Sequence, residues 1–302
     1  MVVSANDARW LETCLSSVYA HAGEIELEAI VVDNASTDGT RELVESRFPR
    51  ARVLTSPNFG FAYGNNRALE CTTARYVLLL NPDTEILQGT FAELLHMLDA
   101  SPEVGIAGVR QVDGEAVLLP TIRRFPNALR ALGEALASER WPLHAAWAGE
   151  RVLDPAAYRS ARDCDWVVGS FLLARREALL AAGMLDERFF LYCEEPDLCL
   201  RVQRAGWRVR YLPRMTIRHH AGKGGVRPRM IAQEAFARRQ YARKHFSRAH
   251  RVLYVSALGA RYALRGRTWA LSVLKGRAAP PFLAPPAQAL TSTVRCCEEA
   301  HI

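Results

Sequence analysis

The sequence lacks the features of membrane-spanning and of secreted proteins. Its longest apolar runs, such as WVVGSFLLA at 166–174, are well short of the roughly 20 residues that a bilayer-crossing helix needs. No charged and then apolar signal segment opens the chain. The seven cysteines include no C-x-x-C pair and fit neither a disulfide framework nor a zinc knuckle. We therefore expect a cytoplasmic protein whose thiols are reduced.

Glycine motifs for phosphate binding are also absent. Neither G-x-G-x-x-G nor G-x-x-x-x-G-K-[ST] occurs, which argues against dinucleotide-dependent enzymes and P-loop ATP enzymes. No Gly-rich loop bearing Arg and Lys lies near the amino terminus, where a sugar nucleotidyltransferase would hold its triphosphate. A chain of 302 residues with 49% apolar composition is nevertheless long enough to bury a substantial core.

Acidic residues are scarce toward the carboxyl terminus. Residues 221–290 hold 14 Lys and Arg but a single acid, Glu234, whereas residues 1–220 hold 24 basic and 29 acidic side chains. The first region alternates strand and helix patterns, and the basic region reads as helices followed by a Pro-rich stretch, which we expect to be disordered. The predicted division is an α/β domain over 1–225, a basic helical extension over 226–278 and a tail over 279–302.

The first polar site candidate follows a buried strand. The run Ala29–Val32 is apolar on both faces, as a parallel strand covered by helices should be. Asp33 directly follows it, at the carboxyl end where open α/β sheets bind ligands. Asp33 therefore either contacts a ligand or forms a local Asx-turn. The strand that precedes this unit has only about four residues before Ala5, so we also expect an upstream start.

A second unit ends in a loop rich in Asn and Gly. A short strand is predicted at Arg52–Thr55, and the loop after it contains Asn58 and Gly60. The helix is expected to resume at about Asn65, with Arg67 at its start. Such a loop can hold a polar ligand, but Asn and Gly are also the ordinary turn formers.

The third unit contains the most strand-like run, Tyr76–Leu80, followed by Asn-Pro-Asp. An isolated carboxylate after a central buried strand suits a divalent cation that bridges phosphates, because Mg²⁺ takes only one or two protein carboxylates. Asp83 is therefore our metal candidate. The same N-P-D-T stretch is also expected to be a turn and the cap of a helix around Gln88–Asp99.

The pattern is weaker between residues 105 and 165. GIAGVRQV at 105–112 indicates another strand, and the stretch Arg123–Trp147 reads as an irregular or helical insertion. WVVGSFLLARREAL at 166–179 then predicts a strand that leads into a helix ending near Gly183.

Three carboxylates, Glu194, Glu195 and Asp197, are crowded into the stretch FFLYCEEPDLCLR. Pro196 is favoured at the first position of a helix, which would make Glu195 the N-cap. Asp197 would then lie in the first turn, four residues before Arg201, where a structural role is sufficient. Two adjacent like charges raise each other's pKa, which suits a general base. Glu195 is the preferred base, and Glu194 and Asp197 remain alternatives.

An ordered set of motifs now carries a family resemblance. VVDNASTDGT, NFGFAYGNNRAL, LLLNPDTEI, VVGSFLLARREAL, GMLDERFFLYCEEPDLCLRVQRAGWRVRYLP and IRHHAGKGG resemble the inverting nucleotide-sugar glycosyltransferases of family two, in particular the bacterial rhamnosyltransferase-like branch. The resemblance covers residues 1–225. It implies a GT-A fold, which is an open, mostly parallel α/β sheet flanked by helices. It also implies sugar transfer from a nucleoside-diphosphate sugar in one displacement with inversion, assisted by Mn²⁺ or Mg²⁺.

The resemblance also assigns roles to single residues. Asp33 corresponds to the acid that contacts the nucleotide base, and Asp83 to the metal-binding end of a D-x-D element in which Asn81 replaces the first Asp. Glu195 corresponds to the catalytic base, where Asp is more common, and His219 to a histidine that can complete the metal site. The donor-binding set is then Asp33, Asn34, Asn58, Gly60, Asn65, Arg67 and Asn81.

The basic stretch Arg227–Arg277 interleaves arginines with aromatic residues. Such helices can lie on an anionic membrane surface, where each basic residue contributes about 1 kcal/mol, or they can pack on the preceding domain. The resemblance suggests a cell-envelope glycan or lipid-linked acceptor at the inner face of the cell membrane, with dTDP-rhamnose as the first donor expected. No nucleic-acid-binding motif accompanies the charge. A sugar nucleotidyltransferase and a noncatalytic membrane- or polyanion-binding protein remain the alternatives.

Overall fold

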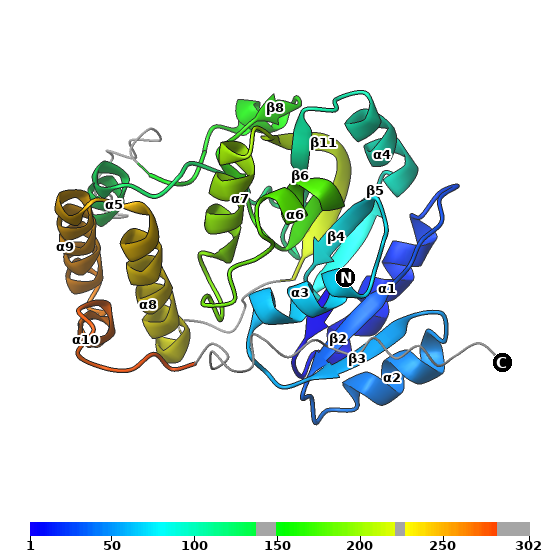
Figure 1. The fold of residues 1–302 in the computed structure, drawn as a ribbon, viewed down its shortest axis with the longest axis horizontal. Coiled ribbons are helices and arrows are strands. Elements are labelled where there is room, and N and C mark those ends of the chain that lie inside the picture. Colours follow the sequence, from blue (N-terminus) through cyan, green and yellow to red (C-terminus); the bar gives the residue numbers. More distant parts are fainter. Residues whose placement is uncertain (137–148, 221–226, 283–302) are drawn as a thin grey trace.

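The computed structural model describes residues 1–136, 149–220 and 227–282. Within them, a nine-stranded sheet consists of β1 (Val2–Ser4), β2 (Ile30–Asn34), β3 (Arg52–Ser56), β4 (Tyr76–Leu80), β5 (Thr84–Gln88), β6 (Val104–Val112), β8 (Arg162–Asp163), β10 (Phe171–Arg175) and β11 (Arg208–His219). The strands follow the order β3-β2-β1-β4-β10-β6-β11-β5, and β8 pairs with β11 (Figure 1). A separate small sheet joins β7 (Ile122–Arg123) and β9 (Trp166–Val167).

Most strands of the large sheet run in one direction, as predicted. β3, β2, β1 and β4 pair in parallel, and so do β6 and β11. β10 lies antiparallel between β4 and β6, while β5 and β8 oppose β11. Because parallel strands end at the same edge, the carboxyl ends of β1, β2, β4 and β11 all lie along one side of the sheet. The strands predicted in the first three units and at 105–112 are present there.

Helices cover both faces of the sheet. One core cluster joins the sheet to α1 (Ala8–Ala20), α2 (Thr40–Arg47) and α4 (Phe91–Asp99), through side chains such as Leu15, Val44 and Leu94. A second cluster joins the opposite face to α3 (Phe61–Glu70), α6 (Arg176–Ala181) and α7 (Glu194–Arg204), through Leu69, Leu179 and Leu198. The strands are therefore buried from both sides, which explains their nearly continuous apolar sequence.

Helix α3 begins at Phe61 rather than at Asn65, so this prediction was wrong. The extra turn packs closely on β1, where a Cβ added to Gly64 would lie 2.8 Å from Cγ1 of Val3. The glycine that signals a loop in the sequence instead permits close contact between helix and strand. Arg67 consequently lies inside the helix and not at its start.

Two further boundaries differ from the sequence prediction. The N-P-D-T turn leads into β5 rather than directly into a helix. Every second side chain of β5, at Thr84 and Ile86, points into the core, and the strand pairs with β11. Helix α4 follows with Thr90 as its cap, in a capping box with Glu93. Helix α7 begins at Glu194, and its N-cap is Cys193 rather than Glu195. Pro196 is tolerated there because the first-turn N–H groups have no partner within the helix.

The basic region is helical, as predicted, and it has a core of its own. Helices α8 (Pro228–His245), α9 (Arg248–Leu264) and α10 (Ala270–Leu274) pack together with α5 (Ala128–Leu136), which comes from the insertion (Figure 1). Tyr254 and Tyr262 are buried in this core. The structure describes the predicted tail only as far as residue 282, and its remainder lies outside the described residues. In the described part of the chain, no helix is long and apolar enough to cross a bilayer.

Candidate active site

The carboxyl end of β2 carries two predicted donor-binding residues. Asp33 is 5% exposed and accepts a hydrogen bond from the backbone N–H of Ser36 at 3.1 Å, so the local turn is present. Asn34 donates to the backbone carbonyl of Gly60 at 3.3 Å, while its Oδ1 atom has no hydrogen-bond partner within the described residues. This oxygen faces α3, since a Cβ added to Gly64 would lie 3.5 Å from it.

Sequence reasoning missed a third acid at this edge. Asp7 accepts a hydrogen bond from the backbone of Ala5 at 3.0 Å, and Asp38 accepts one from Ala8 at 3.0 Å, so the loops after β1 and β2 are bound to each other. Burial raises the pKa of Asp7, and the charges of Asp83 and Asp38 raise it further. The signal available in the sequence was Asp7 itself, which follows a short apolar strand as Asp33 does.

The two predicted metal ligands lie close together. Nε2 of His219 is 3.3 Å from Oδ1 of Asp83, and the backbone N–H of His220 donates to the Asp83 carbonyl at 2.9 Å. Burial alone would raise the pKa of Asp83, but the His219 ring outweighs burial and holds this pKa below its usual value. The His220 ring stacks on Trp10 with 4.7 Å between centroids, which gives it a packing role.

Asp83 and His219 fit a cation that is shared with a substrate. No group of three or more His, Cys, Asp and Glu side chains among the described residues is arranged to hold a metal ion alone. Two protein donors are nevertheless a usual set where phosphate oxygens and waters complete the shell. A carboxylate and an imidazole together suit Mn²⁺ better than Mg²⁺.

The loop before α3 is fixed to the segment that precedes the acidic cluster. Gly60 has φ 99°, and a Cβ added to it would lie 2.1 Å from the carbonyl oxygen of Phe190. That carbonyl accepts a hydrogen bond from Phe61 N–H at 2.9 Å. Gly60 therefore permits a close backbone approach that no other residue allows. Asn58 in the same loop is exposed.

Two more of the predicted donor-binding residues lie within α3. Asn65 donates to the Phe61 carbonyl of its own helix at 2.9 Å, and its Oδ1 has no partner among the described residues. Arg67 is 6% exposed and pairs with Glu187 at 3.0 Å and with Glu70 at 2.7 Å. Arg67 thus holds α3 against the segment that leads into α7.

Glu194 and Glu195 differ in surroundings although they are adjacent. Oε1 of Glu195 accepts a hydrogen bond from Gly169 N–H at 3.1 Å, and this side chain is half-buried. Burial raises the pKa of Glu195, while the Gly169 N–H group and the charge of Arg123 limit the rise. Glu194 is 2% exposed, and its Oε2 atom has no partner in the described chain. Burial and then the charge of Glu195 raise the pKa of Glu194 well above its usual range.

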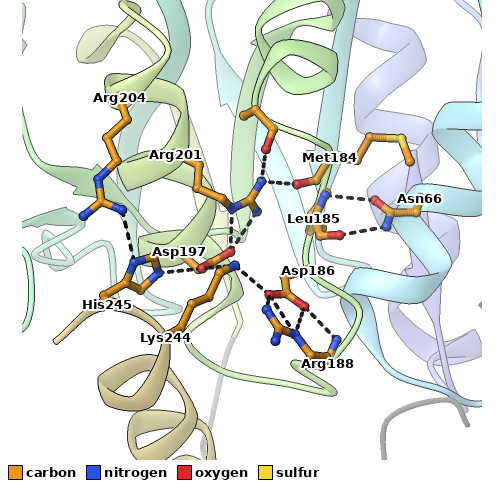
Figure 2. Close-up of polar contacts among 11 residues, drawn as sticks. Asn66, Met184, Leu185, Asp186, Arg188, Asp197, Arg201, Arg204, Lys244 and His245 are labelled. Atoms are coloured by element: carbon orange, nitrogen blue, oxygen red, sulfur yellow. Dashed lines mark hydrogen bonds and ion pairs between the residues drawn. The ribbon is translucent and has the colours of Figure 1, made fainter. Parts of the chain in front are cut away.

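Asp197 lies in an ion-pair network that joins α7 to α8 (Figure 2). Its carboxylate is fully buried and contacts Arg201 at 2.8 Å, Lys244 at 2.6 Å and His245 at 2.7 Å. Burial alone would raise the pKa of Asp197, but its hydrogen bond to His245 and the charges of Arg201 and Lys244 hold it below the usual value. Lys244 also contacts Asp186 at 2.6 Å. The predicted Asp197–Arg201 pair is confirmed, and its extension to α8 was not foreseen.

The candidate residues are connected along one edge of the sheet. Val2 of β1 pairs with Leu80 of β4, and the next residue, Asn81, donates its N–H to the Ser170 carbonyl at 3.1 Å. Gly169 precedes Ser170 and holds Glu195. The ends of β1, β2, β4 and β11 and the start of α7 therefore meet. A cavity of about 590 Å³ lies elsewhere, at the amino ends of β2 and β4, and does not include these acids.

Comparison with known proteins identifies the family. Residues 1–155 match the family described as Glycosyl transferase family 2. The N-acetylglucosaminyl-diphospho-decaprenol L-rhamnosyltransferase of Mycobacterium tuberculosis is 32% identical over 225 residues, which cover 70% of this chain and 71% of that protein. Rhamnosyltransferase WbbL of Escherichia coli is 24% identical over 230 residues, which cover 73% and 82%.

Solved structures show the same fold at low identity. The mannosyltransferase PcManGT from Pyrobaculum calidifontis, in complex with GDP-Man and Mn²⁺, has 20% identity and a TM-score of 0.53 over 96% of this chain and 76% of that one. GalNAc-T7 with UDP, GalNAc and Mn²⁺ has 12% identity and a TM-score of 0.57 over 78% and 46%. The predicted GT-A fold is thereby confirmed, and the two alternatives to a glycosyltransferase are set aside. The chain belongs to glycosyltransferase family 2 and is a sugar-transferring enzyme.

Proposed function

We propose that this glycosyltransferase moves rhamnose from dTDP-rhamnose to a lipid-linked glycan at the cytoplasmic face of the cell membrane, with inversion at the anomeric carbon. The observation that carries the chemistry is the convergence of Asp33, Asp83 and Glu195 on one edge of the sheet. The choice of sugar and acceptor is supported by two relatives named as rhamnosyltransferases, one of which is named for a diphospho-decaprenol substrate.

Glu195 is the proposed general base. Burial and mutual repulsion place a proton on one member of the Glu194–Glu195 pair, and the environments decide which one. The N–H of Gly169 and the charge of Arg123 hold down the pKa of Glu195, whereas the charges of Glu195 and Asp197 add to burial in raising the pKa of Glu194. We therefore assign the proton to Glu194. Glu195, which is half-buried and has a raised pKa, is able to accept the proton of an attacking acceptor hydroxyl.

Asp83 and His219 are the proposed ligands of Mn²⁺ or Mg²⁺, with the Asn81 position beside them. A bound cation would neutralise the charge that develops on the departing nucleoside diphosphate. Asp33 and Asn34 would bind the nucleotide, and Asn58 would contact the donor from the exposed loop. The geometry of Gly60, Asn65 and Arg67 favours a supporting role for these three, since they hold the loop and α3 against residues 187–190.

We propose the division of the chain that the sequence predicts. Residues 1–225 would form the catalytic domain and residues 226–278 an extension that supports α7 through Lys244 and His245. The described start of the tail, residues 279–282, begins five residues after Leu274, the last residue of α10.

The test of the base replaces Glu195 by Gln, with Glu194→Gln as its matched control. Glu195→Gln should lower turnover by at least about 100-fold, because a general base contributes roughly 10²–10⁴ in rate. Donor affinity, measured by isothermal titration calorimetry, should be nearly unchanged. Glu194→Gln should lower turnover far less, because this side chain already carries a proton. Unchanged turnover in Glu195→Gln would remove the assignment.

The test of the donor is a thermal-shift panel of nucleoside-diphosphate sugars with Mn²⁺. The proposal expects dTDP-rhamnose to raise the melting temperature most, because a ligand that binds only the native state stabilises it. A larger shift with a different nucleotide or sugar would replace the proposed donor and leave the family assignment intact.

A further inference from the structure

Helix α9 exposes a face that carries no charge. After its first residue, the exposed positions of this helix are Ala249, Val252, Leu253, Ser256, Ala260, Ala263 and Leu264. The side chains of Val252, Leu253 and Leu264 are 63%, 62% and 67% exposed. A surface helix ordinarily presents charged residues to solvent and apolar ones to the core. Here the face opposite the core is apolar as well.

Helix α5 also exposes apolar side chains. Leu129, Leu132 and Leu136 follow one another at intervals of three and four residues, which places them on one side of the helix. Their exposed fractions are 80%, 43% and 64%. α5 and α9 pack against each other through a shared core, and they lie together at the end of the molecule that is farthest from β3 (Figure 1). We call the exposed side chains of these two helices the α5–α9 face.

Cations border the α5–α9 face. Arg248 and Arg265 are exposed at the two ends of α9. Arg248 and Arg265 therefore place positive charge at both ends of the apolar α9 surface, which favours an anionic partner.

Part of the basic stretch Arg227–Arg277, which the sequence suggested for a membrane, is occupied by contacts within the protein. Arg238 pairs with Glu150 at 2.6 Å and with Glu234 at 2.7 Å, and Lys244 pairs with Asp197 and Asp186. The tyrosines Tyr241, Tyr254 and Tyr262 of this region are buried, whereas Trp269 is 39% exposed. A membrane contact must therefore use a different surface of the helical region.

We propose that the α5–α9 face docks onto an anionic membrane leaflet. Its leucines would enter the boundary between headgroups and acyl chains, and the bordering arginines would contact anionic headgroups, as interfacial amphipathic helices do. An exposed apolar helix face marks an interaction site, and the exposed arginines at both ends of α9 favour an anionic lipid surface over an uncharged protein partner. This inference deepens the proposed function, since it supplies the surface by which an enzyme with a lipid-linked acceptor reaches its substrate.

The experiment is flotation of the full-length enzyme with phosphatidylglycerol-containing vesicles and with phosphatidylcholine vesicles. The wild type should float with the anionic vesicles and much less with the neutral ones, and added salt should weaken its binding. The double variant Leu253→Glu, Leu264→Glu should lower partitioning at least about tenfold. Leu180→Glu is the matched control, because Leu180 is 45% exposed on α6, and it should bind as the wild type does. Circular dichroism and melting temperature verify that each variant is folded.

Three results would overturn the inference. The first is failure of the wild type to float with anionic vesicles, and the second is undiminished flotation of the double variant. The third is a concentration-dependent dimer in analytical ultracentrifugation that Leu253→Glu abolishes, which would assign the face to a second copy of the chain. Transfer to a short-chain, water-soluble acceptor is measured separately. Its loss would count against the proposed function, while vesicle binding would continue to report on the face alone.

Discussion

Replacing Asp197 by Ala should destabilise the enzyme strongly. The change removes the buried carboxylate that Lys244, His245 and Arg201 share, and it leaves all three partners in place. Breaking a buried pair by removing one partner costs roughly 3–5 kcal/mol, because the remaining charge has lost its counterion without regaining full hydration. The side chains of Lys244 and Arg201 are 22% and 17% exposed, so water takes up part of their charge. We therefore expect a loss near the lower limit, about 3 kcal/mol.

The matched control is Asp163→Ala. Asp163 also pairs with two arginines, Arg208 at 3.2 Å and Arg210 at 2.7 Å, but its side chain is 44% exposed. Exposed ion pairs contribute little, so this variant should lose only about 0.5 kcal/mol. The two variants remove the same functional group, which has three partners at Asp197 and two at Asp163, so the number of ion pairs alone would predict similar losses. Their difference therefore measures burial of the network rather than the number of ion pairs.

The measurement is urea unfolding followed by tryptophan fluorescence, supported by melting temperatures. A loss of about 3 kcal/mol should lower the melting temperature by roughly 6–12 °C, at about 2–4 °C per kcal/mol for a domain of about 200 residues. A loss below about 1 kcal/mol, or one equal to that of Asp163→Ala, would refute the argument. It would mean that solvent reaches the junction between α7 and α8 and replaces the carboxylate.

Three other predictions follow from the same contacts. Asp83→Ala should remove the dependence of donor binding on Mn²⁺ in calorimetry, whereas equal affinities of the wild type with and without the metal would contradict the metal site. The folded-state pKa values of Asp197 and Asp186 are held below normal, so their contribution to stability is complete above about pH 4 and is lost as the pH falls further. The free energy of urea unfolding should therefore fall less steeply with decreasing pH in Asp197→Asn than in the wild type. Gly60→Ala should weaken donor binding and stability together, because the new Cβ would lie 2.1 Å from the Phe190 carbonyl oxygen at φ 99°; calorimetry and thermal unfolding that both match the wild type would exclude this strain.

The strands and the site edge were predictable because they depend on local sequence. A short apolar run followed directly by a polar residue fixes both a buried strand and the position of its carboxyl end, as at Tyr76–Leu80 and Asp83. The start of α3 was not predictable, because it depends on how closely Gly64 approaches Val3 from another strand. The start of α7 depends on Cys193, which adopts φ 66° without being a glycine. Contacts between distant segments decided both cases.

The chemistry of the three crowded acids could be predicted only in part, because it also depends on contacts between distant segments. Sequence spacing paired Asp197 with Arg201, but Lys244 and His245 are more than 40 residues away and reach Asp197 only because α8 packs beside α7. The charge of Asp197 still raises the pKa of Glu194, but less than burial and the charge of Glu195 do, and it is not a cause of the shift of Glu195. Their raised pKa values then arise from burial first, and for Glu194 also from the charge of its neighbour.

Helix α8 connects the two surfaces on which the proposals depend. At its carboxyl end, Lys244 and His245 hold Asp197 in the first turn of α7, two residues after Glu195. Along its length α8 shares a core with α9, through Ala235, Ala242 and Leu258, and α9 carries the α5–α9 face. Both sets of contacts are buried, so a membrane-bound α9 would fix the position of α7 through packed helices rather than through a flexible linker. The orientation of the base toward a lipid-linked acceptor would then be set by how the helical region lies on the membrane.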